Sequence, residues 1–190
     1  MSDATQFCKG RHAGLLLPLF SAVSQAGWGI GEIPDLVTLA RWQQEAGLDF
    51  LLMLPVNEMP ASQQSPYSTL TAMAIDPIYV RLAHMPEFVA LGGEAALPVE
   101  QQARLRAARA ASRVDYGAVR ALKYAALRAC FARFDAQHRG RRTARARAFA
   151  AFCERDRGWL DDYALFRALR DRFDGAAWWT WPDGLATRDP

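Results

Sequence analysis

The residues best suited to chemistry form a short run, Gln64-Ser65-Pro66-Tyr67-Ser68, which follows the second of two apolar segments. A tyrosine offers an aromatic face for a sugar ring and a hydroxyl group for a hydrogen bond. In parallel α/β folds, ligands sit beyond the carboxyl ends of the strands, where this run falls. Ser65 and Tyr67 are therefore candidate substrate-binding residues, although a simple turn with the ring packed under the loop fits the same spacing. The aromatic segment 178–181 could also face a sugar, but we expect it to pack at a helix end.

Three carboxylates, Glu32, Glu58 and Asp76, lie near the ends of the predicted strands. Glycoside chemistry needs two carboxyl groups about 5 to 9.5 Å apart, depending on the stereochemical outcome. No motif pairs any two of these residues, so we expect each to be solvated or to cap a helix. The sequence thus identifies no catalytic residue.

Other residue types that carry chemistry form no recognised site. The loop Trp28-Gly29-Ile30-Gly31-Glu32 lacks the GxGxxG spacing and the Walker lysine, so its glycines are expected to permit a tight turn. The three histidines and three cysteines are isolated and match no metal, redox or disulfide spacing, so no metal and no cofactor is predicted. These residues are His12, His84, His138, Cys8, Cys130 and Cys153.

The elements that must position these residues begin with two apolar runs, 14–20 and 50–56. Both are short and unbroken, which is typical of strands buried on both faces of a parallel sheet. A helix between them is predicted to begin at Asp35, as its N-cap, and to end at Gly47. Strand, helix and strand in this order predict a βαβ unit of an α/β protein. Residues 72–82 predict a further short extended piece.

From about residue 99 the pattern becomes helical. One apolar stripe runs from Tyr116 to Phe134 and is interrupted only by Lys123, whose stem is expected to lie along the edge of the stripe. Two further helical stretches are predicted over 143–155 and 160–173. The chain therefore reads as one βαβ unit followed by a helical block.

Charge divides the chain at the same place. Residues 101–150 contain 13 Lys and Arg, two Asp and 16 Ala, a net charge of +11, whereas the other 140 residues have a net charge of −8. A basic segment can bind phosphates. Here the arginines are spread around the helices without interleaved aromatic residues, so a solvated face is expected.

Composition excludes several classes of protein. Hydrophobic residues make up 51% and charged residues 23% of the chain, which is typical of a folded globular protein. No apolar run approaches the roughly 20 residues of a membrane span. The first residues contain no apolar signal segment, so we expect a cytoplasmic protein.

Short motifs along the chain form an ordered series. They are Gly14–Ser21, Trp28–Glu32, Ala46–Leu48, Leu54-Pro55, Ser65–Ser68, Val114–Tyr116, Lys123, Phe131–Phe134, Phe152-Cys153, Trp159-Leu160, Asp162–Phe166 and Trp181-Pro182. Together they resemble the opening of the 4-α-glucanotransferases, the amylomaltases or disproportionating enzymes of glycoside hydrolase family seventy-seven. The resemblance covers about residues 11 to 189.

The resemblance implies a (β/α)8 TIM barrel with a helical insertion after its second strand. Members of the family transfer α-1,4-glucan segments between maltooligosaccharide or starch-type acceptors by a retaining double displacement, with no cofactor. Ser65 and Tyr67 match a loop that contacts the donor sugar. Residues 1–98 would then begin the barrel, 99–176 would form the Arg/Ala-rich insertion, and 177–190 would return towards the barrel.

The family's catalytic carboxylates come from later barrel strands, which the resemblance does not reach in this chain. A closed barrel takes about 250 residues, so the 190 residues provide only two or three strands and an incomplete barrel. Exposed strand edges then predict poor solubility or a molten sheet region. We expect an N-terminal fragment of a transferase that is inactive alone. The alternatives are a non-catalytic glucan-binding or regulatory remnant, and a basic nucleic-acid-binding helical module.

Overall fold

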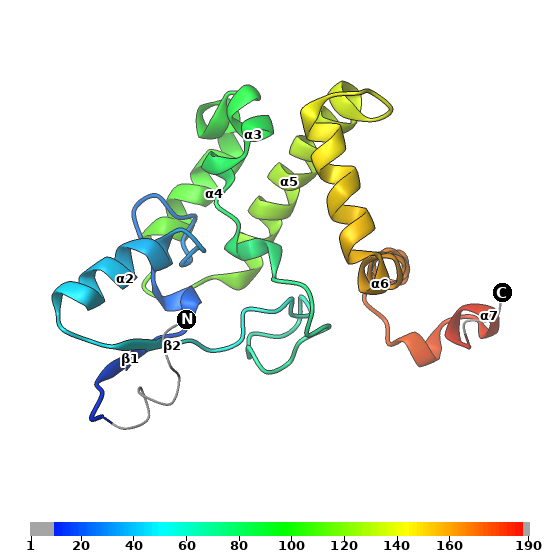
Figure 1. The fold of residues 1–190 in the computed structure, drawn as a ribbon. Helices are drawn as coiled ribbons and strands as arrows, with labels where there is room; N and C mark the ends of the chain where they lie inside the picture. The colour runs from blue at the N-terminus through cyan, green and yellow to red at the C-terminus, as the bar shows by residue number, and fades with distance from the viewer. Residues whose placement is uncertain (1–9, 188–190) are drawn as a thin grey trace.

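A computed structural model describes residues 10–187 and shows a small parallel sheet beside a block of helices (Figure 1). Strand β1 (Gly14–Leu16) pairs in parallel with β2 (Phe50–Leu52), in register from the first residue to the last. Helix α2 (Asp35–Glu45) makes the crossover between the two strands. The βαβ unit predicted from the apolar runs is therefore confirmed.

The ends of α2 agree only in part with the prediction. Gly47 follows the helix with a φ of +70°, a conformation that suits glycine, so the predicted stop is confirmed. Asp35, predicted as the N-cap, is instead the first helical residue. Its side chain accepts the backbone N–H of Glu32 at 2.8 Å, which lies before the helix, so it stabilises the approach to the helix and not its first turn.

Two segments predicted to be extended turn into short 3₁₀ helices instead. The run 14–20 leaves the sheet after three residues and enters η1 (Leu19–Ser21), which follows Pro18. The piece expected within 72–82 forms η2 (Pro77–Tyr79). A proline in the first turn of η2 fixes its φ for a helix, and Asp76 accepts the N–H of Ile78 at 3.1 Å, so the turn has its own start signal.

The rest of the described chain is helical. The elements are η3 (Leu82–His84), α3 (Pro86–Ala90), η4 (Gly93–Ala96), α4 (Val99–Ala110), α5 (Tyr116–His138), α6 (Ala144–Arg172), η5 (Trp178–Thr180) and α7 (Asp183–Ala186). The stretches predicted separately over 143–155 and 160–173 are one helix, α6. It continues through Gly158, where a glycine costs only about 1 kcal/mol. None of the helices within residues 10–187 is long and apolar enough to cross a membrane.

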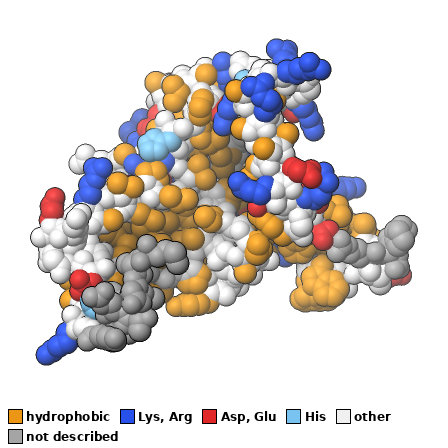
Figure 2. Space-filling view, viewed as in Figure 1, with side chains coloured by type: hydrophobic (Ala, Val, Ile, Leu, Met, Phe, Trp, Pro, Cys, Tyr) orange, Lys and Arg blue, Asp and Glu red, His pale blue; other side chains and the backbone are white. Residues whose placement is uncertain are grey.

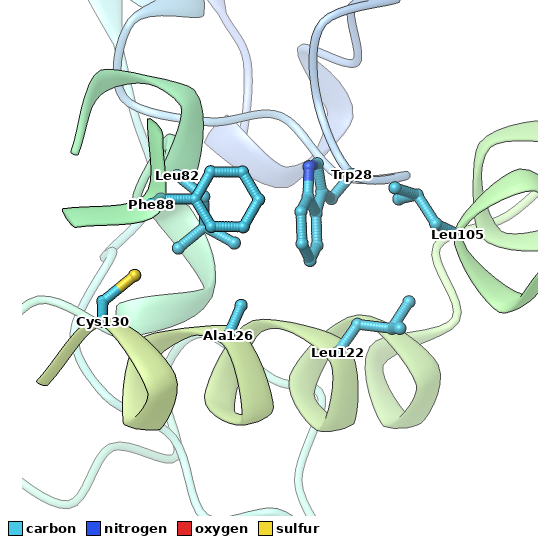
Figure 3. Close-up of a cluster of buried hydrophobic side chains, with 7 residues drawn as sticks. All are labelled: Trp28, Leu82, Phe88, Leu105, Leu122, Ala126 and Cys130. Carbon is cyan, nitrogen blue, oxygen red and sulfur yellow. The ribbon is translucent and has the colours of Figure 1, made fainter. Parts of the chain in front are cut away.

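One core cluster joins the first part of the chain to the helical block (Figure 3). Trp28, from the loop after β1, points its ring toward α5 and meets Phe88 edge-on, with ring centroids 5.8 Å apart. Its indole N–H donates to Glu94 at 2.9 Å, so the polar edge of the ring is satisfied as well. The buried members of the cluster are Trp28, Leu82, Phe88, Leu105, Leu122, Ala126 and Cys130.

A second cluster lies between the loops that follow the two strands and the start of α5. Its buried residues are Leu19, Ile30, Met59, Ile78, Tyr79 and Val119. Neither cluster contains a buried residue of β1 or β2. The apolar contacts that hold the described chain together therefore come from loops and helices.

The sheet itself is open, which contradicts the expectation of strands covered on both faces. Leu16 is 57% exposed, Leu52 52% and Phe50 41%. In Figure 1 the two strands lie at one edge of the molecule, beside α2 and away from α5. Within residues 10–187 the sheet has two strands, and this is too few for the sheet to enclose a core.

The glycines of the loop after β1 serve a tight turn, as predicted. Gly29 has a φ of +81°, and a Cβ atom added there would lie 2.6 Å from the carbonyl oxygen of Ala108. At Gly31 the added atom would lie 1.9 Å from the carbonyl oxygen of Leu19. Both positions leave no room for a side chain, because the backbone itself fills the space.

Replacing Gly31 by alanine is expected to lower the free energy of unfolding by about 2 kcal/mol or more, since backbone must move to admit the methyl group. Gly158→Ala is the matched control. It has open space around its Cβ position inside a helix, so it is expected to raise stability by up to about 1 kcal/mol. Urea unfolding followed by circular dichroism measures both. Equal effects of the two substitutions would contradict the packing described for Gly31.

Candidate functional site

The predicted substrate-binding residues lie on a loop, residues 57–74, that follows β2 and is named here the substrate loop. Ser65 begins a turn in which its carbonyl accepts the N–H of Ser68 at 3.0 Å, and its Oγ accepts the N–H of Tyr67 at 3.4 Å. Tyr67 is 72% exposed. The ring is therefore not packed under the loop, and its face is accessible to a ligand. A role in sugar binding stays a prediction.

The base of the substrate loop is closed by backbone hydrogen bonds. An antiparallel bridge joins Asn57 to Ile75, and the N–H of Glu58 donates to the carbonyl of Ala74 at 3.0 Å. The two ends of the loop are thus held side by side, and the tip projects from a fixed base.

Glu58 fixes this base to the helical block. It is 5% exposed and accepts hydrogen bonds from the hydroxyl of Tyr124 in α5 at 3.0 Å and from the hydroxyl of Tyr163 in α6. The Nε of Arg167 lies 3.0 Å from the same carboxylate. Burial, together with the Glu58 charge, raises the pKa of both tyrosines, so they remain neutral donors. Every oxygen of Glu58 is occupied.

Asp76, which lies just after the substrate loop, makes a similar attachment to α5. Its buried carboxylate receives the guanidinium group of Arg120 in α5 at 2.9 and 3.3 Å, and the backbone N–H of Met59 at 3.2 Å. Burial alone would lower the pKa of Arg120, but the hydrogen bonds and charge of Asp76 outweigh it and raise that pKa. The ion pair therefore stays charged and bidentate.

Glu32, like Asp76, is fully buried. Its side chain accepts hydrogen bonds from Lys123 Nζ in α5, from Arg81 Nε at 2.5 Å and from the Trp28 backbone N–H at 3.2 Å. Arg81 also donates to Asp35 at 2.6 Å. Burial lowers the pKa of Lys123, and the adjacent Glu32 carboxylate opposes this effect. Glu32 and Lys123 are both fully buried, so neither charge is screened by water.

These contacts correct two expectations from the sequence. Glu32, Glu58 and Asp76 are not solvated, because each is buried against a donor from α5. Only Asp76 also caps a helix, the short η2. Lys123 does not lie along the edge of its apolar stripe, because its ammonium group is inside the protein. The sequence signal that could have revealed this burial is the single charged residue in an otherwise apolar stripe, because a buried lysine requires an acidic partner.

The spacing of the donors on α5 explains how one helix holds two loops. Arg120, Lys123 and Tyr124 stand at positions i, i+3 and i+4, which share one face of a helix. Each meets a different carboxylate, Glu32 from the loop before α2 and Glu58 and Asp76 from the two ends of the connection between β2 and η2, and we call these three contacts the α5 clamp. The clamp uses the oxygens of all three carboxylates for structure, so none is free to act as a nucleophile or general acid.

The basic segment is only partly a solvated face. Arg109 forms a bidentate pair with Glu94 at 2.7 and 2.8 Å, and Arg145 forms another with Glu87 at 2.8 and 2.9 Å. Hydrogen bonds from Arg109 are the main reason that the pKa of Glu94 is lowered. For Glu87, burial would raise the pKa, but the Arg145 hydrogen bond outweighs it. Other arginines, such as Arg104, are exposed, as expected.

Three hollows border the substrate loop. One of 460 Å³ lies between Met59, Ala61 and Ser62 of the loop and the arginines of α5 and α6. Another of 460 Å³ includes Gln64, next to Ser65. A third, of 540 Å³, includes Leu70, with aromatic side chains of α6 and the segment after it. The loop therefore projects into a surface with room for ligands on several sides.

The tryptophans near the end of the chain divide into two kinds. Trp181 is buried, stacks on Phe173 with centroids 5.6 Å apart and donates its indole N–H to Ala176, so it packs at the end of α6 as expected. Trp178 and Trp179 are exposed, so the expectation of packing at a helix end is wrong for these two. Within residues 10–187, no group of three or more His, Cys, Asp or Glu residues is arranged to hold a metal ion. Cys8 lies outside the described residues.

A profile of the 4-alpha-glucanotransferase family matches residues 17–190. The chain belongs to this family. It is 31% identical over 172 residues to the 4-alpha-glucanotransferase of Chlamydia caviae, covering 89% of this chain and 30% of that protein. It is 33% identical to the 4-alpha-glucanotransferase of Mycobacterium tuberculosis, covering 95% of this chain and 25% of that protein. The chain thus spans less than a third of the length of these relatives.

The α5 clamp can be tested by a double-mutant cycle. Lys123→Met is expected to lower the free energy of unfolding by about 3 to 5 kcal/mol, because it leaves Glu32 buried without its ammonium partner. Adding Glu32→Gln is expected to cost less than the sum of the two single losses. Arg104→Met, in an exposed pair, is the control and is expected to cost less than about 1 kcal/mol. Additive losses for the buried pair would contradict the contact.

Acid is expected to unfold the chain through its paired carboxyl groups. Asp35, Glu87 and Glu94 have lowered pKa values in the folded state, so their stabilisation is present above about pH 4 and is lost as the pH falls further. Urea unfolding between about pH 6 and 3 is expected to show this decline. Glu94→Gln removes one titrating group and is expected to make the decline shallower. Glu100→Gln, at an exposed position, is the control and is expected to leave it unchanged.

Proposed function

We propose that this chain is the N-terminal part of a 4-α-glucanotransferase, which transfers α-1,4-glucan segments to maltooligosaccharide, starch-type or glycogen-type acceptors by a retaining double displacement. The observation that carries the proposal is the family match over residues 17–190, which contains the substrate loop. The relatives bear the name of this activity. We expect the protein to act in the cytoplasm.

Ser65 and Tyr67 are proposed to bind the donor sugar. The exposed ring of Tyr67 can stack on a pyranose face, and the hydroxyl groups of both residues can hydrogen-bond to sugar hydroxyls. The substrate loop follows the carboxyl end of β2 in a parallel sheet, which is the side where α/β enzymes bind their ligands. The closed base of the loop supports this role, since a fixed base limits the entropy lost on binding.

We further propose the architecture of a (β/α)8 barrel in which β1 and β2 are the first strands. Residues 1–98 would begin the barrel, residues 99–176 would form the helical insertion, and residues 177–190 would lead back to it. The α5 clamp supports this division, because it joins loops of the first part to a helix of the second. The insertion would thus hold the base of the substrate loop in a fixed position.

The catalytic carboxylates are proposed to come from outside the described residues. Glu32, Glu58 and Asp76 are each saturated by donors and cannot attack or protonate a glycosidic bond without breaking the α5 clamp. The chain alone is therefore expected to have no transferase activity.

A chimera tests the proposal. Replacing the matched quarter of the Mycobacterium tuberculosis relative by this chain is expected to give an enzyme that converts maltotriose into glucose and longer maltooligosaccharides. In that chimera, Tyr67→Ala is expected to lower kcat/KM about tenfold or more, which corresponds to at least about 1.4 kcal/mol of lost transition-state binding. Val99→Ala, at an exposed position on α4 outside the loop, is the control and is expected to leave kcat/KM unchanged.

Two results would contradict the proposal. Production of glucose from maltotriose by the chain alone would show that a complete catalytic site is already present. An unchanged kcat/KM for Tyr67→Ala in a folded, active chimera would show that Tyr67 does not contribute to binding of the donor sugar. Titration of the chain with maltooligosaccharides, followed by tryptophan fluorescence, separates the fragment from a glucan-binding remnant, because only the remnant is expected to bind without the rest of the enzyme.

A further inference from the structure

An apolar groove lies between α5 and the first half of α6. The two helices meet at the segment 139–143 and spread apart below it (Figure 1). The hollow between them measures 430 Å³. We call it the phenylalanine groove, and its lining is Met85, Leu127, Cys130, Phe131, Phe134, Ala148, Phe149 and Phe152, with the ion pair of Glu87 and Arg145 at one side.

The large side chains of the groove are packed too loosely to be a closed core. Phe131 is 54% exposed, Phe149 48% and Phe152 40%. Phe134 of α5 contacts Phe149 of α6, and the centroids of the two rings are 5.2 Å apart. Several exposed aromatic rings on facing helices form a continuous apolar surface, which in a folded protein marks a place of association.

The surroundings of the groove are positively charged. Five arginines follow one another through the connecting segment and the first turn of α6: Arg139, Arg141, Arg142, Arg145 and Arg147. Two of these are paired, with Asp135 and Glu87. Among residues 10–187, no carboxylate lies within ion-pair distance of the other three. Figure 2 shows Lys and Arg side chains gathered around this end of the hydrophobic hollow.

We propose that the phenylalanine groove binds an acidic amphipathic helix of a partner protein. Large apolar side chains at i, i+3 or i+4 and i+7 of that helix enter the groove, and its acidic residues face the unpaired arginines. The lining favours this choice over a sugar, because the charged groups that line it, Glu87 and Arg145, already satisfy each other. It also explains the choice over a nucleic acid, which does not fill an apolar hollow.

The interaction is independent of glucan transfer and of the substrate loop. Charge complementarity adds specificity and speeds association, whereas burial of the phenylalanine rings supplies most of the affinity. The two contributions are separable by experiment, since one depends on salt and the other does not.

The test uses the whole chain and three fluorescent peptides of roughly 18 residues, a length at which an isolated helix can form. The first has Leu at i, i+3, i+4 and i+7 with Glu at the charged positions, the second has Lys in place of Glu, and the third has the first composition in scrambled order. Fluorescence anisotropy is expected to show binding of the first at least tenfold tighter than of the others. Raising the ionic strength from about 0.1 to 1 M shortens the Debye length from about 10 to 3 Å and is expected to weaken it.

Matched substitutions locate the binding. Phe149→Ser is expected to weaken the acidic peptide at least tenfold, whereas Leu165→Ser, an exposed apolar position on the same helix outside the groove, leaves it unchanged. Arg141→Glu with Arg142→Glu is expected to weaken the acidic peptide and favour the basic one. The same double charge change at Arg104 and Arg106 on α4 is the control. These surface charge changes do not touch the core, so they remain informative if Phe149→Ser alters folding, which circular dichroism monitors.

Four results would overturn the proposal. Equal affinity for the acidic and basic peptides would show that charge complementarity plays no part in binding. Equal losses of peptide affinity in Phe149→Ser and Leu165→Ser would show that the peptide does not bind in the groove. A dimer that dissociates in the Phe149→Ser variant would assign the groove to a second copy of the chain. The fourth result is binding of duplex RNA by the chain that the Arg141 and Arg142 changes abolish and Phe149→Ser does not. That result would show that these arginines bind nucleic acid and not an acidic helix.

Discussion

One face of α5 determines how the rest of the described chain is arranged. Arg120, Lys123 and Tyr124 each bind a different buried carboxylate, and these carboxylates come from the two loops that follow β1 and β2. A charge moved out of water costs several kcal/mol unless it is paired, so a misplaced helix would leave several uncompensated groups at once. The α5 clamp therefore selects a single docking position for the helix. Its contribution is to the specificity of the arrangement, since apolar residues could supply as much net stability.

The clamp also decides what the first part of the chain can do. Carboxylates near strand ends invite a catalytic interpretation, but here they hold loops in place. Through Glu58, which touches both α5 and α6, the base of the substrate loop is fixed while its tip carries an exposed tyrosine. A rigid base and an accessible tip suit a residue that positions sugar for reacting groups supplied by another part of an enzyme.

The sequence predicted local structure better than long-range pairing. Apolar runs and Gly47 identified the parallel βαβ unit, and the stripe from Tyr116 onward identified α5, because these signals lie within one element. The depth of Lys123 was missed, since its burial depends on Glu32, which is 91 positions away in the chain. The same reason applies to Glu58 and its partners. For Tyr67 the sequence indicated the loop, while its exposure depends on the fixed base of that loop.

The distribution of buried residues follows from this arrangement. Both apolar clusters are built from helices and from loops that α5 holds, and neither includes a buried residue of the strands. The helical block with its attached loops has therefore its own core, and its packing does not depend on cover over β1 and β2. The exposed side of the sheet, with Leu16 and Leu52 facing solvent, is the place where further strands would add the most buried apolar area. In the proposed barrel, the clamp would hold the insertion in place, and the sheet would gain its stability from further strands.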